Sequence, residues 1–404
     1  MFVKNNSKKE KVVLAYSGGL DTSAIIPWLK ENYDLDVIAM VADVGQSKKD
    51  LLGIETKAIN SGASKCYVID LKKVFVKKYV YPVLKTGALY EGKYLLGTAI
   101  ARPIIAKAQI QLANKIKAKF VCHGATGKGN DQVRFEMAYA FLSPKIKIIA
   151  PWREWNMKSR KDLIKYLKNK NITTDASLKK IYSRDENIFH ISTEGGNLED
   201  TWSKPKKNTW VWTKNPEISS EKPQYVLISI KKGHVIGVDK VFMSPIKCLK
   251  KLNYIGSLHG VGRIDIVENR LIGMKSRGCY ETPGGSIMYE AIRSIEQLTL
   301  DRECFYWRQI IGLQMSQIVY DGKWFLPIRK VLQVSSNQIS KKVNGEVLIK
   351  LYKGSITVIK KRSNNSIYSK SYSTFEKDSV YNQKDASGFI NIYSLSSKIM
   401  SKNK

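Results

Sequence analysis

The chain has 404 residues, of which 68 are Lys or Arg and 35 are Asp or Glu, so its formal net charge is +33. Hydrophobic residues make up 43% of the sequence, enough for a packed core, and the length predicts two or three domains. No apolar run approaches the roughly 18 to 20 residues that span a bilayer, and the basic start has too short an apolar run for a signal peptide. We therefore expect a soluble, cytoplasmic protein and exclude secreted, membrane-spanning and wholly disordered classes.

The cysteines and histidines argue against metal and disulfide chemistry. The five cysteines are an odd number, include no CxxC pair and follow no regular spacing, which is typical of free thiols in a reducing compartment. The four histidines include no HExxH arrangement, so we do not expect a transition-metal enzyme.

The positive charge has two interpretations. A pI near 9.8 is typical of nucleic-acid-binding proteins. The basic residues are mostly lysines spread along the whole chain, however, and they form no stripe interleaved with aromatic residues. A composition rich in Lys, Asn and Ile also arises when a genome is poor in G and C. We attribute the charge to solvated surfaces and expect no specific nucleic-acid partner.

The first 150 residues alternate strand-like and helix-like patterns. Strand-like runs occupy 11–16, 36–44, 65–69, 119–122 and 145–150, and helix-like stretches lie between them at 23–31, 48–60, 71–84 and 98–118. Strands separated by helices of this length predict βαβ units, and therefore an α/β fold with a doubly wound parallel sheet.

The pattern changes after Pro151-Trp152. One more helix is expected at 158–170, and residues 173–215 are rich in loop-forming residues. Residues 225–244 alternate like antiparallel strands, a long helical region follows Pro283-Gly284-Gly285, and 345–361 has the pattern of a hairpin. The second half is therefore predicted to be α+β.

The segment Ala15–Ser23 has the features of a phosphate-binding loop. It follows an apolar strand and opens a helix, where free backbone N–H groups and the helix dipole attract an anion. Its two glycines allow close approach to phosphate, Ser17, Thr22 and Ser23 add hydroxyl groups, and Asp21 is placed to hold Mg²⁺ on the same phosphates. The loop is neither a Walker A loop nor a GxGxxG motif.

A second polar cluster begins after the strand-like run at 119–122. Asn130 and Asp131 suit a helix start, and Arg134 follows one turn later on the same face as Asp131. From the residues alone, a capped helix with a surface Arg and a ligand site both remain open.

Loops of the SGGxDS type resemble those of the ATP pyrophosphatases, which cleave ATP between its α- and β-phosphates. The sequence AYSGGLDTS at 15–23 resembles the corresponding motif of the argininosuccinate synthase family, and the stretches at 94–103, 123–136, 150–155 and 260–278 also resemble that family. The resemblance runs from about residue 11 to about 395. A tRNA-modifying ATP pyrophosphatase is the alternative, although sulfur-inserting versions generally need a paired reactive cysteine. A catalytically dead relative is a further alternative, against which intact polar residues in both clusters argue.

The resemblance implies an N-terminal extension at 1–10, an adenine-nucleotide-binding domain at 11–170, a synthetase domain at 171–385 and a C-terminal oligomerisation arm at 386–404. It implies a homotetramer that ligates L-citrulline and L-aspartate to argininosuccinate. ATP is the co-substrate, Mg²⁺ the expected cofactor, and AMP and pyrophosphate are released through a citrullyl-AMP intermediate.

The resemblance also implies the site residues, with Ser17, Asp21 and Arg134 expected to be catalytic. ATP contacts are implied at Ala15, Tyr16, Ser17, Gly18, Gly19, Leu20, Asp21, Thr22, Ser23, Ala42 and Gly124. Citrulline contacts are implied at Tyr94, Asn130, Arg134, Ser183, Ser192, Glu268 and Tyr280, and aspartate contacts at Thr126, Asn130 and Asp131. Ala99 departs from the family, because some relatives carry a citrulline-contacting Ser there. His123 and His259 are assigned no role.

Overall fold

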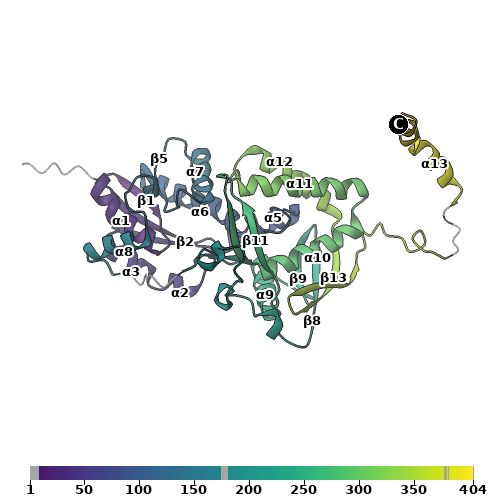
Figure 1. Ribbon diagram of the computed structural model, residues 1–404, viewed down its shortest axis with the longest axis horizontal. Coiled ribbons are helices and arrows are strands. Elements are labelled where there is room, and N and C mark those ends of the chain that lie inside the picture. Colours follow the sequence, from purple (N-terminus) through teal and green to yellow (C-terminus); the bar gives the residue numbers. More distant parts are fainter. Residues whose placement is uncertain (1–8, 174–180, 377–379, 381, 404) are drawn as a thin grey trace, which may run out of the picture.

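The computed structural model describes residues 9–173, 181–376, 380 and 382–403. Most of the predicted N-terminal extension, residues 1–8, lies outside the described residues, as do 174–180 of the expected loop-rich region and residue 404 of the arm. Figure 1 shows an elongated body from which the C-terminal segment with α13 extends. No helix in the described part of the chain has the length and apolarity that crossing a lipid bilayer requires.

The N-terminal part is built on a five-stranded parallel sheet, as the sequence predicts. Its strand order is β3-β2-β1-β4-β5. The strands are β1 (Lys11–Ala15), β2 (Asp36–Asp43), β3 (Lys65–Asp70), β4 (Phe120–Cys122) and β5 (Lys147–Ile149). The helices are α1 (Leu20–Tyr33), α2 (Lys48–Leu51), α3 (Ile54–Asn60), α4 (Lys72–Phe75), a π-helical turn (Val76–Val80), α5 (Tyr81–Thr86), α6 (Gly97–Ile116), α7 (Asn130–Leu142) and α8 (Arg160–Asn169).

Alternation along β1 gives the sheet two hydrophobic faces. Val12 and Leu14 pack on one face against α1, α3 and α8, whereas Val13 packs on the other against α6 and α7. Strands that helices cover on both faces have nearly continuous apolar sequences, and this is why the strands could be predicted from the sequence. This arrangement confirms the predicted doubly wound α/β fold.

The second half contains two antiparallel sheets. One has the order β10-β9-β8-β13-β14, and the other has the order β11-β12-β7-β6. The first comprises β8 (Gln224–Lys231), β9 (His234–Val238), β10 (Val241–Phe242), β13 (Gly345–Tyr352) and β14 (Ser355–Arg362). The second comprises β6 (Ser183–Asn187), β7 (His190–Glu194), β11 (Arg263–Asn269) and β12 (Lys275–Glu281).

The helices of this half are α9 (Pro245–Leu258), α10 (Pro283–Thr299), α11 (Arg302–Tyr320) and α12 (Pro327–Ile339), and the arm contains α13 (Asp385–Tyr393) and α14 (Leu395–Lys402). Short 3₁₀ turns lie at Pro151–Arg153, Gly196–Glu199, Lys207–Thr209, Pro216–Ile218 and Ser340–Lys342. The α+β prediction and the hairpin expected at 345–361 are confirmed.

Two local predictions were wrong. The region expected to be loop-rich contains β6 and β7, because β6 is an edge strand of polar residues (SRDEN) that lacks the apolar alternation of a strand. The single helix expected at 48–60 is interrupted at Gly53, whose φ of +68° lies in the left-handed region that glycine adopts without strain.

The largest hydrophobic core joins the two halves of the chain. Buried side chains from residues 75–104 pack together with those of β8, β9 and helices α9 to α11. The segment that leads into α6 is therefore fixed against the second half, and this contact sets the position of the polar groups described below.

Gln109 is a buried polar group that ties α6 to the parallel sheet. Its Nε2 donates to the carbonyl oxygens of Val13 (2.7 Å) and Cys122 (2.9 Å), and its Oε1 accepts from the Tyr139 hydroxyl. Every polar atom of this side chain is therefore used.

We expect Gln109→Leu to lower the free energy of unfolding by about 2–3 kcal/mol, because it leaves the Tyr139 hydroxyl without a hydrogen-bond partner and removes a donor from two buried carbonyl groups. Urea denaturation measures this change. The double variant Gln109→Leu/Tyr139→Phe is expected to recover part of the loss, since it removes the stranded hydroxyl as well. An unchanged free energy in the single variant would contradict the assignment.

Candidate active site

The loop after β1 presents an uncapped helix N-terminus. Gly19 precedes α1 and no side chain caps that helix, while Gly18 has a φ of +72°. The Ser17 Oγ accepts from the Gly19 amide (3.3 Å) and lies 3.1 Å from the Thr22 Oγ1. The first-turn amides of α1 thus keep the anion-binding capacity that the sequence predicts.

The other predicted ATP residues lie at the same edge of the sheet. Ala42 is near the end of β2, beside β1, and the Tyr16 amide donates to the Met40 carbonyl (2.9 Å). Gly124 follows β4, and a Cβ atom at Gly124 would lie only 3.0 Å from Thr22 Cγ2. Strand order reverses between β1 and β4, so these loops flank the crevice where doubly wound sheets bind ligands.

His123 supports the loop that carries Gly124. Its Nδ1 accepts from the Ala125 amide (3.3 Å), and its Nε2 lies 3.0 Å from Glu136 Oε1, which also pairs with Arg153 (2.7 Å). The ring is buried and both of its nitrogens have partners. These contacts are those of a scaffold residue.

Asp21 lies in the first turn of α1, directly after the two glycines of the loop and Leu20. Burial raises the pKa of Asp21, and the charge of Arg160 opposes that shift. Among the residues that the structure describes, no group of three or more His, Cys, Asp or Glu side chains is arranged to hold a metal ion. A Mg²⁺ ion at this place would therefore depend on phosphate oxygens as well as Asp21.

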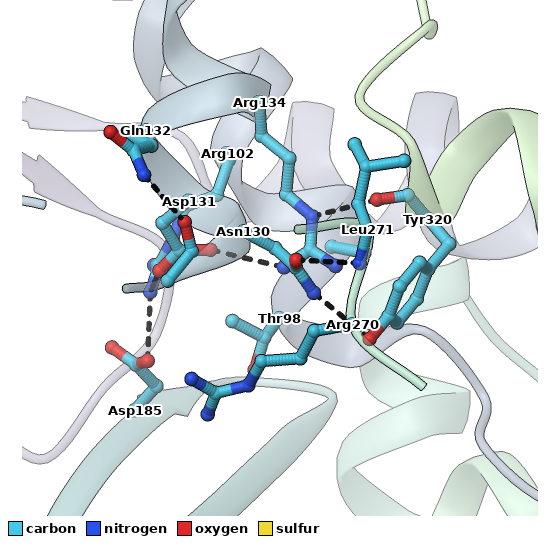
Figure 2. Close-up of polar contacts among 12 residues, drawn as sticks. Thr98, Arg102, Asn130, Asp131, Gln132, Arg134, Asp185, Arg270, Leu271 and Tyr320 are labelled. Atoms are coloured by element: carbon cyan, nitrogen blue, oxygen red, sulfur yellow. Dashed lines mark hydrogen bonds and ion pairs between the residues drawn. The ribbon is translucent and has the colours of Figure 1, made fainter. Parts of the chain in front are cut away.

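The start of α7 carries a network of charged side chains (Figure 2). Asp131 Oδ2 accepts from Arg102 Nη2 (2.7 Å) and its Oδ1 accepts from Arg134 Nη1 (3.0 Å). Arg102 Nη2 also contacts Asp185 Oδ2 of β6 (2.8 Å). Although burial opposes it, the charge of the two arginines lowers the pKa of Asp131 to about 2. The network joins α6 and α7 to the second half of the chain.

Asn130 and Arg134 contact the second half directly. The Asn130 Nδ2 donates to the Tyr320 hydroxyl (2.9 Å), and its Oδ1 accepts from the Leu271 amide (3.0 Å). The Arg134 Nε donates to the Tyr320 carbonyl oxygen (3.0 Å). Figure 2 shows these groups gathered between α7 and the segment around Leu271.

Most residues predicted to contact citrulline lie next to this network. The rings of Tyr94 and Tyr280 have centroids 4.8 Å apart, and Tyr280 is opposite Ser192 in the pairing of β12 with β7. Glu268 Oε1 accepts from the Tyr320 hydroxyl (2.8 Å), and burial raises the pKa of Glu268. Strands β7, β11 and β12 and the segment before α6 thereby bring four predicted residues together.

Three further positions have different environments. Ser183 is exposed on the edge strand β6, opposite Glu194, and Thr126 is exposed in the turn before α7. Ala99 is fully buried in the first turn of α6, and its amide donates to the Tyr94 hydroxyl (3.4 Å). The adjacent Thr98 Oγ1 is buried and has no hydrogen-bond partner among the described residues. A hydroxyl group is therefore present one position from the Ser that Ala99 replaces.

The sequence reasoning assigned no role to Arg102, Tyr320, Arg270 or Glu194. Arg270 Nη2 lies 2.6 Å from Glu194 Oε2, and burial raises the pKa of Glu194 to about 7. Arg102 and Arg270 lie inside stretches that carried the family resemblance, which was the one sequence signal for either residue. Tyr320 and Glu194 lie outside those stretches and have partners on distant elements, so no local spacing indicates their contacts.

Both halves of the chain match models of one family. The Arginosuccinate synthase N-terminal HUP domain matches residues 11–173, and the Arginosuccinate synthase C-terminal domain matches residues 182–400. The chain belongs to the argininosuccinate synthase family. The resemblance drawn from the motifs is confirmed.

Curated relatives match over nearly the whole length. Argininosuccinate synthase of Buchnera aphidicola subsp. Schizaphis graminum is 65% identical over 400 residues, which is 99% of each chain. Argininosuccinate synthase of Serratia proteamaculans is 60% identical over 399 residues, which is 98% of each chain.

One solved structure gives a weak match. The U34-tRNA thiolase NcsA from Methanococcus maripaludis is 17% identical, covers 43% of this chain and 61% of its own, and has a TM-score of 0.29. This similarity is too low to support the tRNA-modifying alternative.

We expect Arg102→Leu to lower the free energy of unfolding by about 2 kcal/mol near neutral pH, because Asp131 and Asp185 lose a shared cation. The depressed pKa of Asp131 stabilises the fold above about pH 4, and this contribution is lost as the pH falls toward about 2. The difference between wild type and variant is therefore expected to shrink in urea titrations at about pH 3. Arg102→Lys, which keeps the charge, is the matched control. An equal difference at every pH would contradict the network.

Proposed function

We propose that this chain joins L-citrulline to L-aspartate, consuming ATP and releasing argininosuccinate, AMP and pyrophosphate. The observation that carries the proposal is the full-length match to argininosuccinate synthases. The arrangement of the site supports it, because an uncapped helix N-terminus and a cluster of arginines and carboxylates follow adjacent strands of one sheet.

The chemistry requires two steps because the ureido group of citrulline has no good leaving group. The ureido oxygen first attacks the α-phosphorus of ATP, so that an O–P bond forms and the bond to pyrophosphate breaks. The neutral α-amine of aspartate then attacks the ureido carbon, AMP leaves with the C–O bond electrons, and the attacking nitrogen loses one proton, so that a guanidinium group forms. Both steps depend on alignment and on stabilising developing negative charge.

The loop at Ala15–Ser23 is proposed to hold the triphosphate, with Ala42 and Gly124 flanking the nucleotide. The first-turn amides of α1 and the hydroxyls of Ser17 and Thr22 offer donors to the departing pyrophosphate. Mg²⁺, when bound with ATP, neutralises phosphate charge, and Asp21 is the carboxylate proposed to hold it.

The groups around α7 are proposed to bind the two amino acids. Arg134 offers a cation to a substrate carboxylate and Glu268 offers an anion to an ammonium group, together with Tyr94, Asn130, Ser183, Ser192 and Tyr280 for citrulline. Thr126, Asn130 and Asp131 are proposed for aspartate. Both oxygens of Asp131 accept from arginines, and each keeps a second lone pair for the incoming amine.

The direct test measures AMP and pyrophosphate with citrulline and aspartate added separately and together. We expect AMP release with ATP only when both amino acids are present, and argininosuccinate in equal amount. AMP release that follows added tRNA instead of the amino acids would overturn the proposal.

We expect Asp21→Asn to reduce kcat by about 100-fold or more without changing thermal stability, because it removes the carboxylate beside the phosphate loop. Asp34→Asn is the control, since Asp34 lies at the other end of α1 and is exposed. Near-normal turnover of the Asp21 variant, at unchanged stability, would show that this carboxylate is not needed.

We also propose that the protein is a cytoplasmic homotetramer, with domains at 11–170 and 171–385 and an arm at 386–404 that reaches a neighbouring subunit. The arm lies away from the body (Figure 1) and has no buried residue in α13 or α14. Its exposed apolar side chains are Phe389, Ile390, Ile392, Tyr393, Leu395, Ile399 and Met400.

Such a surface is normally covered by a partner. Light scattering is expected to give four chains per particle for the full-length protein and fewer after removal of residues 386–404. A truncated protein that keeps its full-length assembly would contradict the role of the arm.

A further inference from the structure

Tyr320 contacts three of the residues proposed to bind citrulline. It is the last residue of α11 and its side chain is fully buried. Its hydroxyl accepts from Asn130 and donates to Glu268, and its carbonyl oxygen accepts from the Arg134 Nε. No motif in the sequence includes this residue. Its position nevertheless makes it the common partner of Glu268 and of Asn130 and Arg134, the last two of which are shown with it in Figure 2.

The hydrogen bonds around Tyr320 form a chain whose donors and acceptors are fixed from the Leu271 amide to Glu268. The Leu271 amide can only donate, so it fixes the Asn130 Oδ1 as acceptor and turns the Asn130 NH₂ toward Tyr320. The Tyr320 hydroxyl, which has a single proton, then donates that proton to Glu268 Oε1. A backbone amide thereby sets the orientation of a buried carboxylate three residues earlier in the chain.

The other oxygen of Glu268 is left available. Glu268 Oε2 is buried and has no hydrogen-bond partner among the described residues. A buried carboxylate oxygen without a partner is costly, so an arrangement that keeps one is typical of a binding site that a ligand completes. The ligand group that complements it is a cation with hydrogen-bond donors.

The ring of Tyr320 is also fixed in place. Tyr90 stacks on it with a centroid separation of 3.6 Å and an interplanar angle of 3°, and the Arg134 guanidinium carbon lies 4.9 Å from its centroid. The Tyr90 hydroxyl donates to the carbonyl oxygen of Asn269, the residue after Glu268. Stacking and a cation–π contact hold the hydroxyl at one position against Glu268.

We propose that Tyr320 is a positioning residue for substrate recognition: its hydroxyl binds one oxygen of Glu268 so that the other receives the α-ammonium group of citrulline. This inference rests on the proposed function. It makes Tyr320 a determinant of specificity for an α-amino acid over a ureido acid without the amino group.

The test compares wild type with Tyr320→Phe, which removes only the hydroxyl. The KM for L-citrulline is expected to rise about tenfold, because Glu268 is no longer held and the Asn130 amide loses its acceptor. The KM for ATP is expected to stay within about twofold, and kcat within about threefold. A purely structural role would change the KM for ATP together with the KM for citrulline.

A substrate analogue sharpens the test. The compound 5-ureidopentanoate is citrulline without its α-amino group, so it cannot use the free oxygen of Glu268. Wild type is expected to bind L-citrulline much more tightly than this analogue in calorimetry, and Tyr320→Phe is expected to reduce that ratio about tenfold. An unchanged ratio would overturn the inference.

Tyr81→Phe is the matched control. The Tyr81 hydroxyl is also buried and donates to the carbonyl oxygens of Val235 (3.0 Å) and Pro245 (3.3 Å), neither of which is proposed to bind a substrate. It is expected to leave the ratio unchanged, and a fall equal to that of Tyr320→Phe would overturn the inference.

Calorimetry separates this inference from the proposed function because it needs no turnover. If wild type binds citrulline but releases no AMP, the proposed function fails while the ratio still decides the role of Tyr320. If wild type does not bind citrulline at all, both are overturned.

Discussion

Arg102 lies between two carboxylates that come from different halves of the chain. Asp131 begins α7 beside the nucleotide loops, and Asp185 belongs to the antiparallel sheet that carries Ser192 and Tyr280. Asp131 is the more buried of the two carboxylates and would be costly to keep charged without a cation, whereas Asp185 is partly exposed, and one arginine pairs with both. Because Arg134 shares Asp131, the position of one guanidinium depends on the other. Ion pairs therefore fix the relative positions of the groups proposed to bind the amino acids. Apolar packing is not directional and would fix those positions less precisely.

The nucleotide side of the molecule depends on a different constraint, which is the parallel sheet. Parallel strands place all their carboxyl ends at one edge, so the loops after β1, β2 and β4 meet without any side-chain network to bring them together. The α1 N-terminus then supplies backbone donors that every residue type except proline provides. Backbone geometry thus forms the side of the site proposed for the triphosphate, and side-chain charge forms the side proposed for the amino acids.

This difference explains how much could be predicted from the sequence. The buried strands and the loop Ala15–Ser23 are local features, and their spacing alone predicts a sheet and an anion site. The strand Ser183–Asn187 was not predicted, because its polar residues have little local preference for a strand and it forms through pairing with β7. The roles of Arg102 and Tyr320 depend on partners far away in the chain, and spacing carries no information about such contacts. The residue-by-residue substrate assignments came from family resemblance, and they remain predictions that the geometry accommodates.

The shared hydrophobic core has a consequence for how the chain folds. Residues 75–104 are synthesised early, yet their buried side chains pack against α9, α10 and α11, which are made more than 140 residues later. Until those helices emerge, the segment lacks many of the apolar partners that cover it, although the parallel sheet can already form. Contacts of such long sequence separation slow folding and leave intermediates with exposed apolar surface. An N-terminal fragment ending near residue 173 would carry the loop Ala15–Ser23 together with an exposed apolar surface that favours aggregation. The two halves therefore depend on each other during folding as well as at the proposed substrate site.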